Sequence, residues 1–307
     1  MPTLLDYRRR VRSVKSTQQI TRAMKFVAAA KLRRAQEGVF AARPYAAEIL
    51  RVLRSAAARM ETPAHPLLAR RPEERILAVI LTGDRGLAGA FNANVIRRGR
   101  EFLQEHPGQQ LQVMVIGRKG RDALRKRGVK FVNEYLNVSS QVEFKTAKEI
   151  AGRIAELYST EEVDAVYAIY NEFKNVMVQK LRAEKLLPID PAVIAPEKAA
   201  GKPGEQGGAE SEAQTSTNAA MVDYIYEQPI GEIFAGLVPR YLEAEVFRVL
   251  LESAAAEHAA RMTAMDSATR NASELIDRLT LQMNKVRQAD ITKQLIEIVS
   301  GAASATA

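Results

Sequence analysis

The stretch that decides the fold is residues 240–300, RYLEAEVFRVLLESAAAEHAARMTAMDSATRNASELIDRLTLQMNKVRQADITKQLIEIVS. None of its 61 residues is Gly or Pro, the two residues that most often interrupt a helix. At about 1.5 Å per residue, one unbroken helix of this length would reach roughly 90 Å, far beyond the helices of ordinary globular domains. The stretch therefore predicts a coiled-coil helix in the C-terminal part of the chain.

Apolar spacing within this stretch indicates that the helix pairs with a second one. Toward its C-terminal end the apolar residues follow the three-then-four step of a heptad seam: Ile276, Leu279, Met283 and Val286. Farther upstream the seam consists of alanines: Ala254, Ala255, Ala256, Ala259, Ala260, Ala264, Ala268 and Ala272. Because alanine side chains are small, they let the backbones of two helices approach closely.

The partner is predicted in residues 1–60, which read as a second long helix. Thr3 can serve as its N-cap with Asp6 at the third helical position, and the only breakers before Arg59 are Gly38 and Pro44, where a bend is expected. The residues expected on its packed face are Val14, Met24, Val27 and Ala28, with Ala23, Ala30 and Ala35 close by. Antiparallel pairing follows if both helices leave the same side of the segment between them.

The basic character of the chain belongs to its N-terminal segment. The net charge is +9, yet residues 1–60 contain 14 Lys or Arg against three acidic residues, while residues 240–307 contain eight basic and nine acidic ones. Such a segment fits nucleic acid, anionic lipid or an acidic protein partner. Nucleic-acid readers often add stacking aromatics, but aromatic residues make up only 6% of this chain, which favours a solvated charged face.

Residues 73–228 have the pattern of a doubly wound α/β domain, preceded by a proline-marked linker at residues 61–72. Apolar runs typical of buried strands lie at residues 76–82, 111–116 and 163–170, with a further strand expected at 176–187. Helix-like stretches lie at residues 92–105, 119–127 and 142–158. Because strands alternate with helices, the sheet is predicted to be largely parallel.

The last part of this domain contains a segment that does not read as a folded element. Residues 196–220 are rich in Gly, Ala, Ser, Glu and Gln and have almost no large apolar side chain, so they are predicted to form a flexible loop. Order is expected to resume at Tyr224 and Tyr226, before the C-terminal coiled-coil helix of residues 229–307.

A glycine-rich loop, TGDRGLAGAFN at residues 82–92, follows the first predicted strand and opens a helix. This is the context in which such loops bind phosphate, and an α/β enzyme that binds a nucleotide there is one alternative. The loop matches neither GxGxxG nor GxxxxGK[ST], and no acidic residue is spaced to bind a ribose. A tight strand-to-helix turn that needs small residues is therefore the favoured interpretation.

Other chemistry is sparse in this sequence. Cys is absent, which excludes disulfides and thiolate chemistry, and the three histidines His65, His106 and His258 are too scattered to suggest a metal cluster. No nucleophile and base can be paired by spacing, so we assign no catalytic residue, metal or cofactor. No run of 18 uncharged apolar residues suggests a membrane span, and the N-terminal residues lack a secretory-signal pattern.

The end of the C-terminal helix is more apolar than an exposed helix tip should be. Its large apolar residues are Ile291, Leu295, Ile298 and Val299. They suggest that an apolar partner encloses the tip, and burial on the chain's own domain is the alternative, which the length of the helix disfavours.

Three motifs, in order, closely resemble those of the gamma subunit of rotary ATP synthases. They are TQQITRAMKFVAAAK at residues 17–31, DRGL with GAFN at 84–92, and NKVRQADIT with EIVSGA at 284–302. The resemblance covers nearly the whole chain except residues 196–220. It implies an antiparallel coiled coil of the terminal helices with a Rossmann-like domain that binds no nucleotide.

The resemblance also implies a non-catalytic, mechanical role. The coiled coil would stand inside a hexamer of alternating alpha and beta subunits, while its foot rests on the membrane c-ring and contacts the epsilon subunit. Proton flow would turn ring and shaft together and drive each beta subunit in turn through binding, synthesis and release of ATP. No nucleic acid or small-molecule ligand is expected.

Individual residues match family positions with known contacts. Those near the beta-subunit levers are Met24, Lys25, Arg287, Gln288 and Thr292, and those of the segment that contacts the ring are Tyr224, Tyr226 and Glu227. Ala88 stands where many relatives have Cys, and without any Cys the thiol regulation of the chloroplast form is impossible. The lack of a convincing transit peptide points to a bacterial protein, peripheral to the cytoplasmic face of the plasma membrane.

Overall fold

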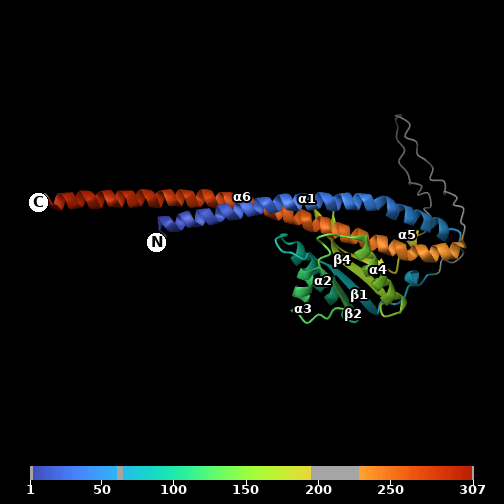
Figure 1. The fold of residues 1–307 in the computed structure, drawn as a ribbon. Coiled ribbons are helices and arrows are strands. Elements are labelled where there is room, and N and C mark those ends of the chain that lie inside the picture. Colours follow the sequence, from blue (N-terminus) through green and yellow to red (C-terminus); the bar gives the residue numbers. More distant parts are fainter. Residues whose placement is uncertain (1–2, 61–64, 195–227, 306–307) are drawn as a thin grey trace, which may run out of the picture.

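The computed structural model describes residues 3–60, 65–194 and 228–305. Figure 1 shows a rod of two long helices with an α/β domain along one side of it. The helices α1 (Leu4–Ala57) and α6 (Ile230–Ala305) run antiparallel, so that both ends of the chain lie toward the same end of the rod (Figure 1). The predicted combination of a coiled coil with a Rossmann-like domain is confirmed.

Sequence signals explain where α1 begins and how it packs. The Thr3 hydroxyl accepts a hydrogen bond from the Asp6 backbone N–H at 3.3 Å, and the Asp6 carboxylate accepts one from the Thr3 N–H at 2.9 Å. This reciprocal cap satisfies donors that the first helical turn leaves unpaired. Less exposed residues then recur at steps of three and four: Leu4, Tyr7, Val11, Val14, Gln18, Thr21, Lys25, Ala28 and Leu32.

The packed face predicted for α1 is only partly correct. Val14, Met24, Ala28 and Ala35 are buried or half-buried as expected. Val27 is 58% exposed, and Ala23 and Ala30 also face solvent. Because the seam advances by three and four residues through Lys25 and Ala28, Val27 falls one position outside it.

The helix α6, predicted within residues 229–307, begins at Ile230 and continues through Pro239. A proline inside a helix leaves the carbonyl four residues earlier without its usual partner, here that of Ala235. The ring of His65 hydrogen-bonds to the Ala235 backbone and supplies that missing contact. Phe234 and Val238 are fully buried in the domain core, so tertiary packing holds the turn helical despite the proline.

The α/β domain is built on a five-stranded sheet of order β3-β2-β1-β4-β5. The strands are β1 (Arg75–Leu81), β2 (Gln110–Ile116), β3 (Asn133–Tyr135), β4 (Ala165–Phe173) and β5 (Gln179–Leu187). The first four are parallel, and β5 pairs antiparallel with β4 at the edge. The predicted strands are present, while β3 was missed because a three-residue strand with the sequence Asn-Glu-Tyr carries no apolar run.

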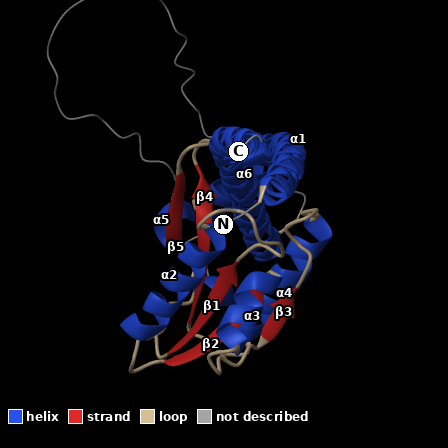
Figure 2. Ribbon diagram, turned by 90° about the vertical axis from the view of Figure 1, so that its left-hand side faces the viewer, coloured by secondary structure: helices blue, strands red, loops and turns tan. Residues whose placement is uncertain are grey.

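Helices cover both faces of the sheet (Figure 2). The remaining helical elements are α2 (Phe91–Glu105), α3 (Arg118–Arg125), α4 (Phe144–Ser159), α5 (Pro191–Ile194) and the 3-10 turn η1 (Pro66–Leu68). One core lies between the sheet and α2 with α3, and the larger core joins the other face to α4, the end of α1 and the first part of α6. The long helix α6 therefore belongs to the domain core and to the rod at once.

The turn from β2 into α3 depends on glycine at one position. Gly117 has φ of 96°, and a Cβ there would lie 2.0 Å from the Thr82 carbonyl oxygen. Gly128 also has positive φ, 78°, but a Cβ there would meet nothing within 4 Å. A side chain at Gly128 would therefore cause backbone strain alone, whereas one at Gly117 would cause strain and a steric collision.

We expect Gly117→Ala to lower the free energy of unfolding of the α/β domain by at least about 4 kcal/mol, because strain and collision add. The matched variant Gly128→Ala should cost only about 1–2 kcal/mol, the strain alone. Urea unfolding followed by circular dichroism measures both, and equal losses would contradict the collision argument.

Candidate functional site

The two helices of the rod are held in register by polar pairs at one level. The hydroxyls of Thr21 and Thr269 lie 2.8 Å apart, and the Lys25 ammonium lies 2.5 Å from the Asp266 carboxylate. This ion pair lowers the pKa of Asp266, chiefly through the Lys25 hydrogen bond. Residue numbers thus rise along α1 in the direction in which they fall along α6, which confirms the antiparallel pairing.

The alanines of α6 pack on two sides rather than one. Ala255 and Ala259 are fully buried in a cluster with Leu32 of α1. Ala256, also fully buried, packs with Ala88 and Phe91, which belong to the loop and helix after β1. We predicted these alanines for helix pairing alone, but the structure shows that they also bring the α/β domain against α6.

The glycine-rich loop is a tight strand-to-helix turn, as the favoured interpretation predicted, and its groups bind one another. The Gly83 N–H donates to the Asn92 side-chain oxygen at 2.8 Å, and the Asn92 amide donates to the Arg85 carbonyl at 3.3 Å. The Asp84 carboxylate accepts from the backbone N–H groups of Arg118 and Asn137 at 3.0 and 2.9 Å. The Gly83 N–H and the two backbone N–H groups at the Asp84 carboxylate are therefore hydrogen-bonded inside the domain.

A buried ion pair of α6, Glu257 with Arg261, packs against the glycine-rich loop. Glu257 is only 3% exposed, and a Cβ on Gly83 would lie within 2.8 Å of its carboxylate oxygens. The Arg261 guanidinium contacts this carboxylate at 2.6 Å and donates to the carbonyls of Arg85 and Gly86 at 3.4 and 3.3 Å. A carboxylate thus lies against the loop, where a nucleotide would need room and positive charge.

The residues expected to contact beta subunits lie at two levels. Met24 and Lys25 are half-buried, with Lys25 paired to Asp266, whereas Arg287, Gln288 and Thr292 are exposed. Arg287 lies 21 positions beyond Asp266 along α6, a rise of about 30 Å. The structure therefore does not bring the two groups together, and Lys25 is already paired within the chain.

The residues expected to contact the membrane ring, Tyr224, Tyr226 and Glu227, lie outside the described residues, as does the loop predicted at residues 196–220. That part of the candidate site stays a prediction from sequence.

The tip of α6 extends beyond the start of α1 (Figure 1). The Thr21–Thr269 pairing places Leu4, where α1 begins, at the level of about residue 286, so the following residues have no partner helix. Apolar side chains of this tip are 48–68% exposed: Ile291, Leu295, Ile296, Ile298 and Val299. The described tip residues are therefore not buried on the chain's own domain, which was the alternative.

Further features of the described residues limit the site chemistry. They hold no group of three or more His, Asp or Glu side chains placed to bind a metal ion. None of the described helices is long and apolar enough to cross a membrane.

Comparison with known proteins defines the class first. A family model described as ATP synthase matches residues 3–305. The chain is also 52% identical to an ATP synthase gamma chain of Solibacter usitatus, covering 99% of this chain and 100% of the relative. It is 46% identical to one of Pelotomaculum thermopropionicum, covering 99% of each. The chain therefore belongs to the ATP synthase gamma chain family.

Solved structures share the fold. A chain of the Euglena gracilis mitochondrial ATP synthase aligns with a TM-score of 0.65 at 22% identity, covering 98% of this chain and 94% of that one. A chain of the central stalk and c-ring of the Tetrahymena thermophila mitochondrial enzyme aligns with a TM-score of 0.57 at 23% identity, covering 81% and 99%.

The buried His258 of α6 makes the stability of the fold depend on pH in a way that can be tested. Burial, with Arg261 and Lys31 nearby, lowers the pKa of His258 to about 4, against 6.5 for a free imidazole. The unfolded chain therefore binds a proton between pH 6.5 and 4 that the folded chain does not, so stability falls as pH drops through this window. We expect His258→Gln to remove about 2 kcal/mol of the loss between pH 7 and pH 5.

The measurement is the melting temperature of wild type and variant at both pH values. Leu32→Ala, in the adjoining cluster, is the matched control and should lower stability by a similar amount at pH 7 and pH 5. An unchanged pH dependence in His258→Gln would contradict the assignment of this acid sensitivity to His258.

Proposed function

We propose that the chain is the rotating central shaft of a proton-driven bacterial ATP synthase. In this role it couples rotation of the membrane c-ring to the conformational cycle of the catalytic beta subunits. The observation that supports it best is the exposed apolar tip of α6 at the end of a stiff rod, in a chain of the gamma family. An exposed group of apolar side chains of this kind marks a surface that a partner covers.

Stiffness in torsion is the first requirement of a shaft, and the rod has it where two helices pair. Less exposed residues of α1 recur every three or four positions from Leu4 to Leu32, and the Lys25–Asp266 ion pair and the Thr21–Thr269 hydrogen bond add directional contacts with α6. Twisting one helix against the other would break these contacts. The paired part can therefore transmit torque along its length.

Asymmetry is the second requirement. Two helices in one part of the rod and a single helix at the tip have no threefold symmetry, so three equivalent beta subunits would meet different faces of the shaft. A ligand or partner shifts an equilibrium only through differential contacts with its states. Unequal contact with the shaft would hold the three subunits in different states, and rotation would exchange them.

The tip would turn in an apolar sleeve made by the alpha and beta subunits. Apolar contact is non-directional, so Ile291, Leu295 and Ile298 can slide past their surroundings without breaking specific bonds. Below them, the exposed Arg287, Gln288 and Thr292 would make directional contacts with the beta subunits. This division gives a bearing at the tip and a lever beneath it.

The charge of α1 fits the same position. Outward-facing basic residues line its first part: Arg8, Arg9, Arg10, Arg12, Lys15 and Arg22. They suit acidic side chains on the beta-subunit levers near Met24 and Lys25. Since Lys25 already pairs with Asp266, an acidic beta-subunit residue would share or replace that partner.

The α/β domain would form the foot of the shaft. By sequence, Tyr224, Tyr226 and Glu227 would contact the c-ring, and the epsilon subunit would bind nearby. The glycine-rich loop, closed by Glu257 and Arg261, supports a role without nucleotide binding or catalysis. The shaft would thus be a peripheral protein at the cytoplasmic face of the plasma membrane.

Co-purification tests the assembly. A tagged chain isolated from its native membrane should bring down two related ATPase subunits in a ratio of three to three to one, with the epsilon subunit. Recovery as a free monomer would contradict the proposal. Micromolar binding of ATP or NAD by the isolated chain would instead favour the α/β enzyme.

Deletion of residues 287–307 should weaken coupling of ATP hydrolysis to proton pumping while the α/β domain stays folded, because the domain core uses no described side chain of this segment. Pumping by vesicles and the melting temperature of the full-length and shortened chains give the two readouts. As a matched pair, Ile298→Ser should lower rotation torque, whereas Gln294→Ser, at another exposed position of the tip, should leave it unchanged. An unfolded domain in the deletion would overturn the claim that the tip serves a partner.

A further inference from the structure

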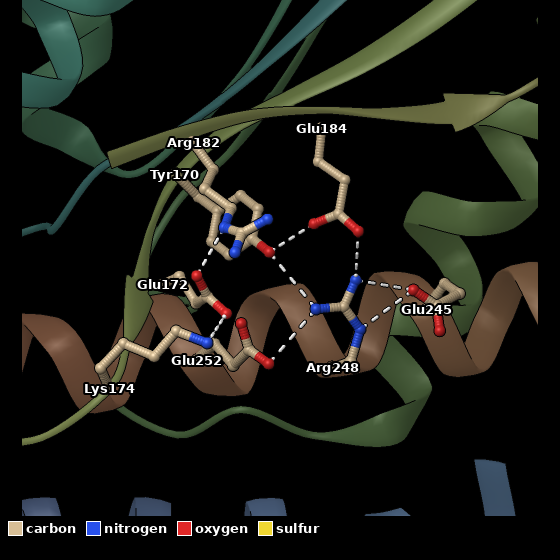
Figure 3. Close-up of polar contacts among 8 residues, drawn as sticks. All are labelled: Tyr170, Glu172, Lys174, Arg182, Glu184, Glu245, Arg248 and Glu252. Carbon is tan, nitrogen blue, oxygen red and sulfur yellow. Dashed lines mark hydrogen bonds and ion pairs between the residues drawn. The ribbon is translucent and has the colours of Figure 1, made fainter. Parts of the chain in front are cut away.

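One arginine of α6 is bound from both the sheet and its own helix. Arg248 lies between Tyr170 of β4, Glu184 of β5 and the α6 residues Glu245 and Glu252, which we call the Arg248 cluster (Figure 3). Tyr170 is fully buried and donates its hydroxyl proton to Glu184 at 2.5 Å. The cluster thus joins the α/β domain to the shaft helix.

The guanidinium uses all of its hydrogen-bonding capacity in this position. Its Nε and one terminal nitrogen donate to Glu245 at 3.0 and 2.7 Å. The same terminal nitrogen donates to Glu184 at 2.8 Å, and the other donates to the Tyr170 hydroxyl at 3.3 Å and to Glu252 at 3.2 Å. Five N–H groups therefore make five contacts, which fixes both the position and the plane of the guanidinium.

Burial and charge show that these contacts are not incidental. Burial lowers the pKa of Arg248, but Glu245 and Glu184 outweigh this and hold the pKa above its usual range. Burial raises the pKa of Glu252. The neighbouring Glu172 does not compete for Arg248, because Lys174 and Arg182 bind it at 2.6 and 2.5 Å.

Packing on the other side of Arg248 is loose. A largely apolar groove of about 440 Å³ lies between α1 and α6, bordered by Tyr45, Phe144, Phe247 and Arg248. Here α1, which contains Pro44, does not press α6 against the sheet. The junction of shaft and domain at this level therefore depends on the contacts of the domain side.

The contacts between α6 and the domain differ in how well they fix the orientation of the helix. Around the cluster, the core between α6 and the sheet is apolar, and apolar contact is less directional than a hydrogen bond. Buried ion pairs add little net stability, because desolvation offsets attraction, yet they can select one geometry. Arg261, which binds the loop after β1, is another directional contact, 13 positions or about 20 Å farther along α6.

We propose that Arg248 is a positioning residue that sets the rotational angle of the α/β domain on the shaft helix and carries torque between them. This inference rests on the proposed shaft function. With Arg261 it gives two directional attachments at different heights, so α6 can neither turn nor slide against the domain. The fork of the guanidinium, rather than its charge alone, supplies the constraint.

The geometric test needs no partner subunit. The chain has no Cys, so Ala93→Cys on α2 and Ser273→Cys on α6, both exposed, accept one spin label each in the full-length chain. We expect Arg248→Lys, which keeps the charge but loses the fork, to widen the distance distribution between the labels. Arg278→Lys, on the exposed side of α6, is the matched control and should leave it narrow.

The functional test uses the whole enzyme in vesicles. Arg248→Lys should lower ATP synthesis at a limiting proton gradient several-fold, while ATP hydrolysis without load in the same preparation stays within about twofold. If Arg248→Lys does not fold, Tyr170→Phe removes one contact of the guanidinium without changing charge and should give a smaller loss of the same kind.

The outcomes separate the two claims. A widened label distribution with unchanged loaded synthesis would overturn the role in torque, and an unchanged distribution would overturn the positioning role. Failure of the chain to assemble with ATPase subunits would instead contradict the shaft function and leave the label measurement interpretable. Equal losses with and without load would also count against the inference, because a merely structural defect lowers both.

Discussion

The structure depends on the contact that the small residues of α6 make on two sides at once. Ala255 and Ala259 admit Leu32 of α1, and Ala256, one residue away, admits Ala88 and Phe91 of the domain. A larger side chain at Ala255 or Ala259 would push α1 away from α6, and one at Ala256 would push the domain away, because interiors packed this closely have no room for added volume. The rod, the domain and their junction therefore share one crowded turn of helix.

Apolar burial brings the parts together, and polar contacts decide how they are oriented. The core of α4, α6 and the sheet contains residues that could pack in several related ways. Directional groups exclude most of these: the Lys25 pair sets the register of the two helices, and Arg261 ties α6 to the loop after β1. The guanidinium of Arg248 alone makes five such contacts.

Long-range polar pairs are also what sequence reasoning could not supply. Helix length, heptad spacing and strand-like runs predicted the coiled coil and the α/β domain, because these signals are local. Glu184 and Arg248 are 64 residues apart, and no spacing rule relates them. Pro239 does not interrupt α6, because burial of Phe234 and Val238 outweighs a local helix breaker. The residues predicted at the beta-subunit levers rest on resemblance and remain a prediction.

The arrangement of the rod has a consequence for assembly. The first residues of α1 and the last described turn of α6 lie at the narrow end of the molecule, and the wide α/β domain lies toward the other (Figure 1). A body of this shape can enter a closed ring of subunits only tip first, and only until the domain meets the rim. The domain would then act as a stop that sets insertion depth, so the heights of Lys25 and Arg287 inside the ring would follow from where the sheet attaches to α6.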